Sequence, residues 1–169
     1  MEKHRLLVVV RHAKAEQLAA SDVERVLSAR GRADGRALGA WLAAQGITPD
    51  VAYVSYAART RETWEVVAEG AGWSLEPQLD GSLYGTDEDG VLELVHATPA
   101  DASTVVVVGH NPTMAMLVQL LDDGEGAASG ARDLVTFPTS AAAVLTVEGS
   151  WSDVVALGCR LESFHVGRA

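Results

Sequence analysis

The chain has 169 residues, which is about one domain on a prior of ~150 residues per domain and enough to bury a real core. Hydrophobic residues make up 48% and charged residues 21%, as in soluble globular proteins, and the longest apolar runs fall far below the ~18–20 residues of a membrane span. The net charge of −10 argues against a general nucleic-acid or membrane-surface role, because both partners are polyanions. It still allows a local Arg and His cluster that holds a small anion.

The start of the chain and its cysteine content indicate the compartment. Residues 1–5 lead directly into an apolar run without a small-residue cleavage site, so we expect no signal peptide. Cys159 is the only cysteine and can form no disulfide within the chain. We therefore expect a cytoplasmic protein with a single domain over 1–169, present as a monomer or a weak dimer.

Strands and helices alternate along the chain, a pattern typical of an α/β sheet covered on both faces. In the first half we expect a strand over 6–10, a polar loop over 15–26, a helix over 28–45, a strand over 51–55, a helix over 56–69 that Ser55 caps and Gly70 ends, and a short strand over 73–76. In the second half we expect a helix over 87–97, a strand over 104–108, a helix over 112–121 capped by Asn111 with Pro112 first, a mobile loop over 122–130, and an antiparallel pair of strands over 141–147 and 154–157.

Three glycines recur at every fourth position of the helix predicted over 28–45. They are Gly31, Gly35 and Gly39. A dinucleotide-binding fingerprint would need them in a turn between a strand and a helix, and here they lie inside the helix. We interpret them as the face that packs closely against a neighbouring helix.

Two of the predicted strands end in a histidine. Arg11 and His12 follow the apolar run over 6–10, and Gly109 and His110 follow the valine run over 104–108. Open α/β sheets bind their ligands at the carboxyl ends of the strands. A single histidine there is more often structural, but two of them with an arginine predict a pocket for an anion.

A phosphoryl group is the anion that suits these side chains. Its transfer needs fixed positive charge and a nucleophile, and a neutral His12 imidazole can attack phosphorus and form a phosphohistidine. Arg11 and Arg59 are predicted to grip the non-bridging oxygens in bidentate fashion. Arg59 lies in the first turn of its helix and faces inward, whereas Arg61 faces solvent. His110 is predicted to donate a hydrogen bond to the phosphoryl oxygens.

These residues resemble the histidine phosphatase superfamily and, within it, the small SixA-like phosphohistidine phosphatases. Arg11-His12, followed by 13–15, resembles the nucleophile signature of the family. The stretch over 55–63 resembles its second-arginine motif, and 109–112 resembles its second-histidine motif. The likeness spans 6–147, with Asp22, Arg25, Leu27 and Gly31 matching the segment after the first strand.

The resemblance implies an open three-layer α/β sandwich of the phosphoglycerate mutase-like type, with a mostly parallel central sheet and helices on both faces. It implies a phosphatase in which His12 is phosphorylated during turnover and Arg11, Arg59 and His110 form the phosphate pocket. It implies no cofactor and no metal, and the five histidines show no zinc-ligand spacing.

Two residues depart from the family pattern. Tyr56 stands where the family commonly has proline, and Glu62 stands where it commonly has glutamine. We expect both to affect the rim of the pocket or the packing of a helix, because neither removes a group that the chemistry needs.

The stretch over 79–85 bears on the substrate. Phosphoglycerate-mutase-like members carry a glutamate general acid just before a Tyr-Gly pair, and Gly81 stands at the matching position here. General acid catalysis contributes ~10²–10⁴-fold when the leaving group needs a proton. An alkoxide needs one, whereas an imidazole with a reference pKa near ~6.5 leaves more easily. Asp80 could serve as a replacement acid, or it could be a solvated loop carboxylate.

We expect a phosphorylated protein carrying phosphohistidine as the partner, because short connections leave the cleft open. Two alternatives stay open: a phosphatase for a small phosphomonoester such as a sugar phosphate, and a non-catalytic module that binds a phosphorylated partner. Lys14 could recruit substrate at the rim or simply face solvent, and Ser140 could line the pocket or belong to the core.

Overall fold

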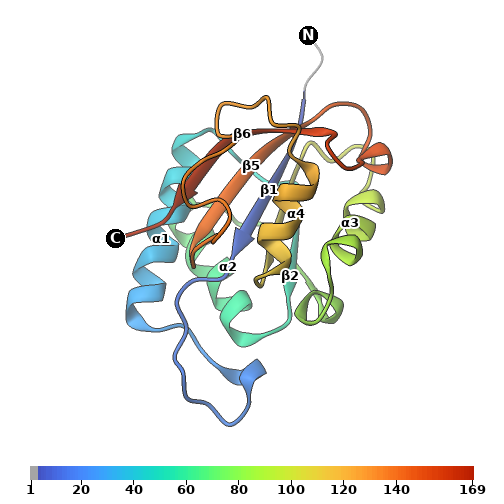
Figure 1. Ribbon diagram of the computed structural model, residues 1–169. Coiled ribbons are helices and arrows are strands. Elements are labelled where there is room, and N and C mark those ends of the chain that lie inside the picture. Colours follow the sequence, from blue (N-terminus) through green and yellow to red (C-terminus); the bar gives the residue numbers. More distant parts are fainter. Residues whose placement is uncertain (1–3) are drawn as a thin grey trace.

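A six-stranded sheet forms the centre of the computed structural model, which describes residues 4–169 (Figure 1). The strands lie in the order β3-β2-β4-β1-β5-β6. They are β1 (Arg5–Arg11), β2 (Val51–Ser55), β3 (Gln78–Asp80), β4 (Thr104–Gly109), β5 (Ala141–Val147) and β6 (Cys159–Val166). The first four are parallel to one another, and β5 is antiparallel to both β1 and β6. The predicted, mostly parallel sheet is confirmed.

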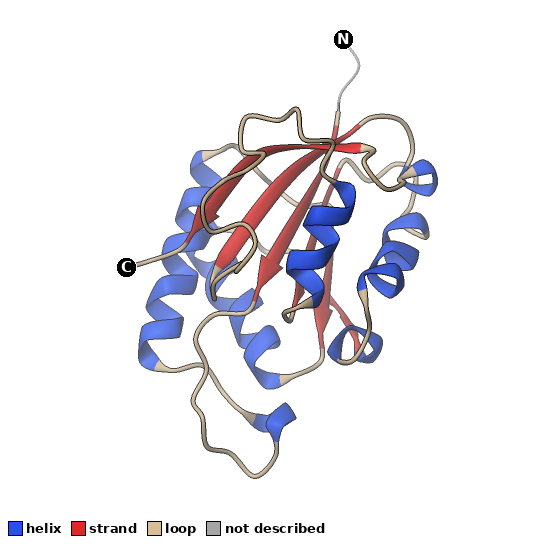
Figure 2. Cartoon of the chain, in the orientation of Figure 1, coloured by secondary structure: helices blue, strands red, loops and turns tan. Residues whose placement is uncertain are grey.

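Helices cover both faces of this sheet (Figure 2). They are α1 (Ala29–Ala44), α2 (Ala58–Ala71), α3 (Glu88–His96) and α4 (Thr113–Leu121), with short 3-10 helices at Asp22–Glu24, Gly81–Tyr84 and Trp151–Asp153. Successive side chains of a strand point to opposite faces. Leu7 and Val9 of β1 therefore pack with α3 and α4, while Val8 and Val10 pack with α1 and α2. The three-layer α/β architecture is confirmed.

The register of the two central strands determines where the candidate site lies. β1 and β4 pair in parallel from Leu6 opposite Thr104 to Arg11 opposite Gly109. The residues that follow these strands, His12 and His110, therefore emerge side by side at one edge of the sheet.

The glycine face of α1 packs against α2, as predicted. A Cβ atom at Gly35 would lie 2.4 Å from Cγ2 of Val66, and one at Gly39 would lie 2.0 Å from the carbonyl oxygen of Val67. Only glycine allows the two helices to approach this closely. The contact holds α2, which carries Arg59, firmly against α1.

Helix α2 begins and ends later than predicted. It starts at Ala58 with Ala57 in the N-cap position, so Ser55 is not its cap, and it ends at Ala71, with Gly72 as the C-cap at a φ of 75°. The predicted end, Gly70, lies inside the helix, because its missing side chain makes room for α1: a Cβ atom there would lie 2.1 Å from the carbonyl oxygen of Arg36.

The strand predicted over 73–76 is wrong. The chain there is anchored by Trp73, whose indole Nε1 donates to the carbonyl oxygen of Ile47 at 3.0 Å, and the sheet resumes only with β3. The strand predicted over 154–157 is also wrong, although its antiparallel partnership with β5 is right for β6, which starts at Cys159. Trp151 is buried and donates to the carbonyl oxygen of Ala102 at 2.8 Å, so the chain enters the core before it pairs.

Helix α4 starts at Thr113, with Pro112 rather than Asn111 in the N-cap position. The Asn111 side chain still accepts from the backbone N–H of Ala115 at 3.3 Å through its Oδ1, and its amide nitrogen donates to the carbonyl oxygens of Thr136 and Phe137, each at 3.0 Å. The segment over 122–130 contacts β6, because the space at Gly126 is filled by the backbone of Leu161. Its mobility stays a prediction.

Over residues 4–169, none of the helices combines the length and the apolar character that crossing a bilayer requires.

Candidate active site at the ends of β1 and β4

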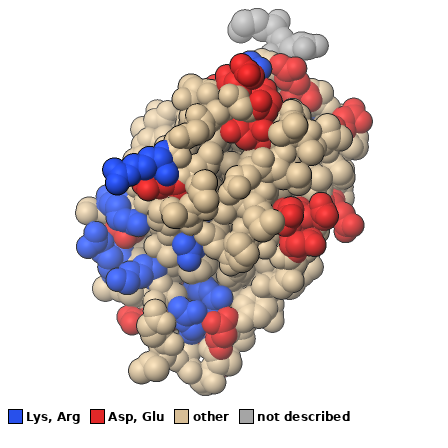
Figure 3. Space-filling view, viewed as in Figure 1, with Lys and Arg blue, Asp and Glu red and all other residues tan. Residues whose placement is uncertain are grey.

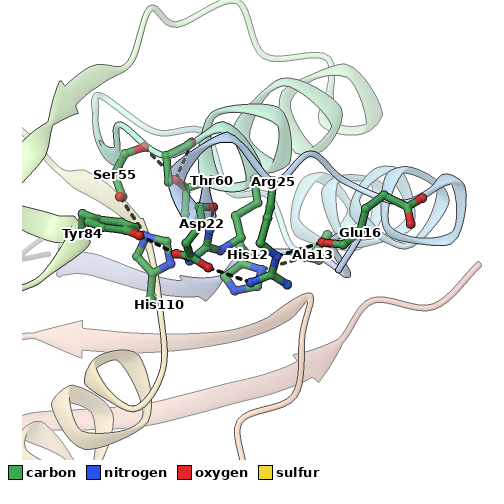
Figure 4. Close-up of polar contacts among 11 residues, drawn as sticks. His12, Ala13, Glu16, Asp22, Arg25, Ser55, Thr60, Tyr84 and His110 are labelled. Atoms are coloured by element: carbon green, nitrogen blue, oxygen red, sulfur yellow. Dashed lines mark hydrogen bonds and ion pairs between the residues drawn. The ribbon is translucent and has the colours of Figure 1, made fainter. Parts of the chain in front are cut away.

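His12 is held at the end of β1 with one ring nitrogen free. Its backbone N–H donates to the carbonyl oxygen of Gly109 at 3.1 Å, which extends the ladder between β1 and β4. Its Nδ1 lies 2.7 Å from the carbonyl oxygen of Ala13 (Figure 4). Because a carbonyl oxygen can only accept, Nδ1 carries the proton, and the lone pair lies on Nε2. This is the tautomer that a nucleophilic histidine needs.

The surroundings keep His12 neutral. Burial lowers its pKa to about 3, against a partial upward effect of the Ala13 carbonyl. The neighbouring His110, Arg59 and Arg11 lower the pKa further, because each disfavours another positive charge nearby. These three neighbours are the other predicted site residues, so their charges act on His12.

Arg59 is buried and faces the site, as predicted. Its guanidinium donates to the carbonyl oxygen of Asp22 at 2.9 Å and to the Asp22 carboxylate at 3.1 Å. Within the described part of the chain, its buried Nε has no hydrogen-bond partner. Arg61 is exposed and donates to the carbonyl oxygen of Tyr56 at 3.0 Å, in agreement with the prediction.

Arg11 is held by the segment that precedes β5. One of its terminal nitrogens donates to the carbonyl oxygen of Phe137 at 3.1 Å, and its buried Nε has no hydrogen-bond partner among residues 4–169. An unpartnered buried donor is costly, so the Nε groups of Arg11 and Arg59 are suited to an anion that accepts from both.

His110 faces His12, with 5.5 Å between the ring centroids. Its Nε2 lies 2.8 Å from the hydroxyl oxygen of Ser55. Burial lowers the pKa of His110 to about 4, and the charge of Arg59 lowers it further. Ser55 was predicted to cap α2, and its contact with His110 is a role that the sequence reasoning missed.

A second missed group is the network around Asp22. This carboxylate accepts from Arg59, from Arg25 at 3.0 Å and from the hydroxyl of Tyr84 (Figure 4). Donation from Tyr84 is the largest cause that holds the pKa of Asp22 well below its usual range, followed by donation from Arg25. In the sequence, Asp22 and Arg25 belong to a segment that resembles the family, and no sequence pattern connects either one to Tyr84.

Lys14 and Asp80 are the two residues predicted as a possible general acid or rim group. Lys14 has an exposed side chain, and its carbonyl oxygen accepts from Ser28. The Asp80 carboxylate accepts from the backbone N–H of Ser82 at 2.8 Å and also from its hydroxyl. Asp80 therefore caps the 3-10 helix that begins at Gly81.

The structure also shows the surroundings of three residues whose roles the sequence leaves open, Glu62, Tyr56 and Ser140. The Glu62 carboxylate accepts from the backbone N–H of Leu27 at 3.1 Å and from Arg32 at 2.6 Å, so it joins α2 to α1 and to the loop before it. Tyr56 is 44% exposed at the rim. Ser140 is buried and donates its backbone N–H to the carbonyl oxygen of His12 at 3.2 Å, and its hydroxyl has no partner among the residues that the structure describes.

Charge is unevenly distributed over the molecule. Figure 3 shows Lys and Arg side chains on the left and lower parts of this face, and Asp and Glu mainly at the top and right. Within the described residues 4–169, no three His, Cys, Asp or Glu side chains come close enough together to hold a metal ion.

Comparison with known proteins identifies the family. The model of the histidine phosphatase superfamily (branch 1) matches residues 7–90. An uncharacterized protein of Mycobacterium tuberculosis is 35% identical over 162 residues, which cover 94% of this chain and 100% of that protein. A structure from Nakamurella multipartitia, provisionally assigned as the phosphohistidine phosphatase SixA, is 35% identical with a TM-score of 0.85, and 98% of each chain is covered. The protein histidine phosphatase SixA in complex with tungstate is 25% identical with a TM-score of 0.79, covering 95% of this chain and 96% of that one.

The motifs, the geometry and the comparisons therefore agree on one family. The chain belongs to branch 1 of the histidine phosphatase superfamily, a family of phosphatases, and within it the chain is SixA-like.

Proposed function

We propose that the protein is a protein phosphohistidine phosphatase that works through a covalent phosphohistidine on His12. The observation that carries the proposal is the state of His12: a buried, neutral imidazole with its proton on Nδ1 and its Nε2 free. Arg11, Arg59 and His110 are proposed to bind the phosphoryl group around it. The tungstate complex of a SixA relative supports this assignment, because tungstate is a tetrahedral oxyanion like phosphate.

In the first step, the Nε2 lone pair of His12 forms a bond to phosphorus while the bond from phosphorus to the substrate nitrogen breaks. The electron pair of that bond goes to the leaving imidazole, which departs neutral when its other nitrogen carries a proton. The guanidinium groups of Arg11 and Arg59 stabilise the charge on the non-bridging oxygens throughout.

In the second step, water attacks the phosphoenzyme. The bond between phosphorus and Nε2 breaks, its electron pair returns to Nε2, and the protons of the water leave with inorganic phosphate. His110 can donate to a phosphoryl oxygen from Nδ1 if Ser55 donates to its Nε2, because the ring then carries its proton on Nδ1.

The carboxylates beside the pocket favour a phosphohistidine substrate over an alkyl phosphate. Asp22 is held as an anion by its donors, so it is not placed to give a proton to an alkoxide, and Asp80 is engaged as the cap of the neighbouring 3-10 helix. An imidazole needs less help, because its reference pKa near ~6.5 makes it a far better leaving group.

We also propose that catalysis requires no metal ion, because the two arginines supply the positive charge that phosphoryl transfer needs. Activity is expected to survive dialysis against EDTA. A loss of activity that added Mg²⁺ or Zn²⁺ restores would overturn this part of the proposal.

The test is rapid-quench labelling with a radioactive phosphohistidine peptide. We expect an acid-labile, base-stable label on the wild-type protein and none on His12→Ala, which should also lose turnover. Full turnover by His12→Ala would refute the covalent mechanism.

The choice of substrate separates the alternatives. A phosphohistidine peptide should be hydrolysed with a much larger kcat/KM than a sugar phosphate, and the reverse ranking would identify a small-molecule phosphomonoesterase. Tight phosphopeptide binding without phosphate release over hours would identify a binding module.

A further inference from the structure

A row of four rings leads from the nucleophile to the surface. The centroid of His12 lies 5.5 Å from that of His110, His110 lies 5.5 Å from Tyr84, and Tyr84 lies 5.6 Å from Tyr56. His12 is buried at one end of the row, and Tyr56 is 44% exposed at the other. The row therefore connects the phosphate pocket to solvent.

The two tyrosines of the row are held in place by different contacts. Tyr84 donates its hydroxyl to Asp22, and its ring lies under the guanidinium of Arg59, with 5.9 Å between the Cζ atom and the ring centroid. Tyr56 meets Tyr84 edge to face, with 79° between the ring planes. A Cβ atom at Gly81, the first residue of the same 3-10 helix as Tyr84, would lie 3.8 Å from Cδ1 of Tyr56. The exposed ring thus lies against both ends of this 3-10 helix.

On this side of the site, a leaving group would meet aromatic rings rather than a free carboxylic acid. The carboxylate of Asp80 faces Ser82, and that of Asp22 already accepts from three side chains. An aromatic ring packs favourably against a second ring in edge-to-face or offset geometry, beyond the gain from burying apolar area.

We propose that Tyr56 and Tyr84 form the leaving-group subsite, and that Tyr56 is a specificity-determining residue that favours a planar ring attached to phosphorus. The favoured substrate class is an N-phosphorylated imidazole, and an amine or alkyl leaving group of similar size gains less. The inference rests on the proposed function, since it describes what leaves when His12 attacks.

The experiment compares two small substrates that both contain a phosphorus–nitrogen bond. Phosphoimidazole carries a ring on its leaving nitrogen, and phosphoramidate does not. The ratio of their kcat/KM values is measured for the wild type, Tyr56→Phe and Tyr56→Leu. The two substrates differ in intrinsic reactivity by the same factor for every variant. A change in the ratio of their kcat/KM values therefore reports on the leaving-group subsite.

Tyr56→Leu is expected to lower the ratio about 3–10-fold, mainly through KM for phosphoimidazole, because leucine fills space without a ring. Tyr56→Phe is expected to keep the ratio within about twofold of wild type, because it keeps the ring. The matched control is Leu79→Ala in β3, a 54% exposed apolar side chain outside the row, which should leave the ratio unchanged.

Each other outcome overturns the inference. An unchanged ratio in Tyr56→Leu means that no ring is recognised, and an equal loss on both substrates means that Tyr56 has only a structural role. A fall in the ratio for Tyr56→Phe as large as for Tyr56→Leu assigns the effect to the hydroxyl. Labelling of His12 by phosphoramidate is measured in parallel. If no label forms, the proposed function itself is refuted. If a label forms and the ratio is the same in Tyr56→Leu as in the wild type, only the leaving-group subsite is refuted.

Discussion

The hydroxyl oxygen of Ser55 lies 2.8 Å from Nε2 of His110, and this contact joins the last residue of β2 to the residue that follows β4. Ser55 is fully buried, so little water competes for its hydrogen bond to His110. It therefore orients the imidazole and leaves Nδ1 as the nitrogen available to the proposed phosphate site.

Ser55→Ala is expected to lower kcat/KM about tenfold, the equivalent of one hydrogen bond that orients a reacting group. The measurement is steady-state kinetics with a phosphohistidine peptide. Ser28→Ala is the control, because it removes the N-cap of α1 and costs stability without contacting His110. Equal losses of kcat/KM in the two variants would show that Ser55 acts only through stability.

The two active-site histidines should make the protein less stable as the pH falls. Their pKa values are lowered by burial to about 3 in His12 and about 4 in His110. Below pH ~6.5 the unfolded chain binds a proton at each histidine while the folded chain does not, so the free energy of unfolding decreases by up to ~1.4 kcal/mol per pH unit for each one. Above that pH neither histidine contributes a slope.

Urea unfolding at several pH values between 4 and 7 checks this expectation. His12→Asn should show a shallower pH dependence of the free energy of unfolding than the wild type, by about one proton. Parallel curves for the two proteins would mean that His12 titrates normally in the folded state.

Gly81→Glu should extend the substrate range. A side chain at this position meets only the Tyr56 ring, at 3.8 Å, so the added carboxyl group can be accommodated. It stands where mutase-like relatives are expected to carry their acid, and it should raise the hydrolysis of an alkyl phosphate by ~10-fold or more, since general acids contribute ~10²–10⁴-fold. Gly81→Gln is the control without an acid. A gain of the same size in both variants would exclude proton donation as the cause.

Gly39→Ala should destabilise the fold. The added methyl group would lie 2.0 Å from the carbonyl oxygen of Val67, so α1 and α2 must move apart. We expect the free energy of unfolding to fall by roughly 1–3 kcal/mol, even though alanine is otherwise the better helix former. Gly85→Ala is the control: nothing lies within 4 Å of its Cβ position, and its φ of −129° suits any residue. A loss of less than ~0.5 kcal/mol for Gly39→Ala would contradict the packing argument.

Local sequence patterns predicted burial and side-chain orientation correctly where these depend on a single helix or strand. The valine run of β4, the apolar run of β1 and the glycine face of α1 each predicted their burial correctly. The inward orientation of Arg59 also followed from its position on a helix.

Contacts between distant segments were not predictable in the same way. Ser55 has the composition of a helix cap, and only the pairing of β2 with β4 brings it to His110. Asp22 and Tyr84 lie 62 positions apart in the sequence and form a hydrogen bond beside Arg59. No sequence periodicity marks either residue. The strand β6 was placed too early because the burial of Trp151 lengthens the connection before it.

The proposed nucleophile, His12, is part of the last rung of the sheet, since its backbone N–H still donates to the carbonyl oxygen of Gly109. The neighbouring strand offers four consecutive valines, Val105–Val108, whose side chains are interchangeable along its length. A shift of this strand by two residues would keep every valine on its face and yet carry His110 about 6–7 Å from its place. The polar residues at the ends of the two strands therefore determine how the strands align. A chain that folds with β4 shifted by two residues would still bury its valines but would be inactive.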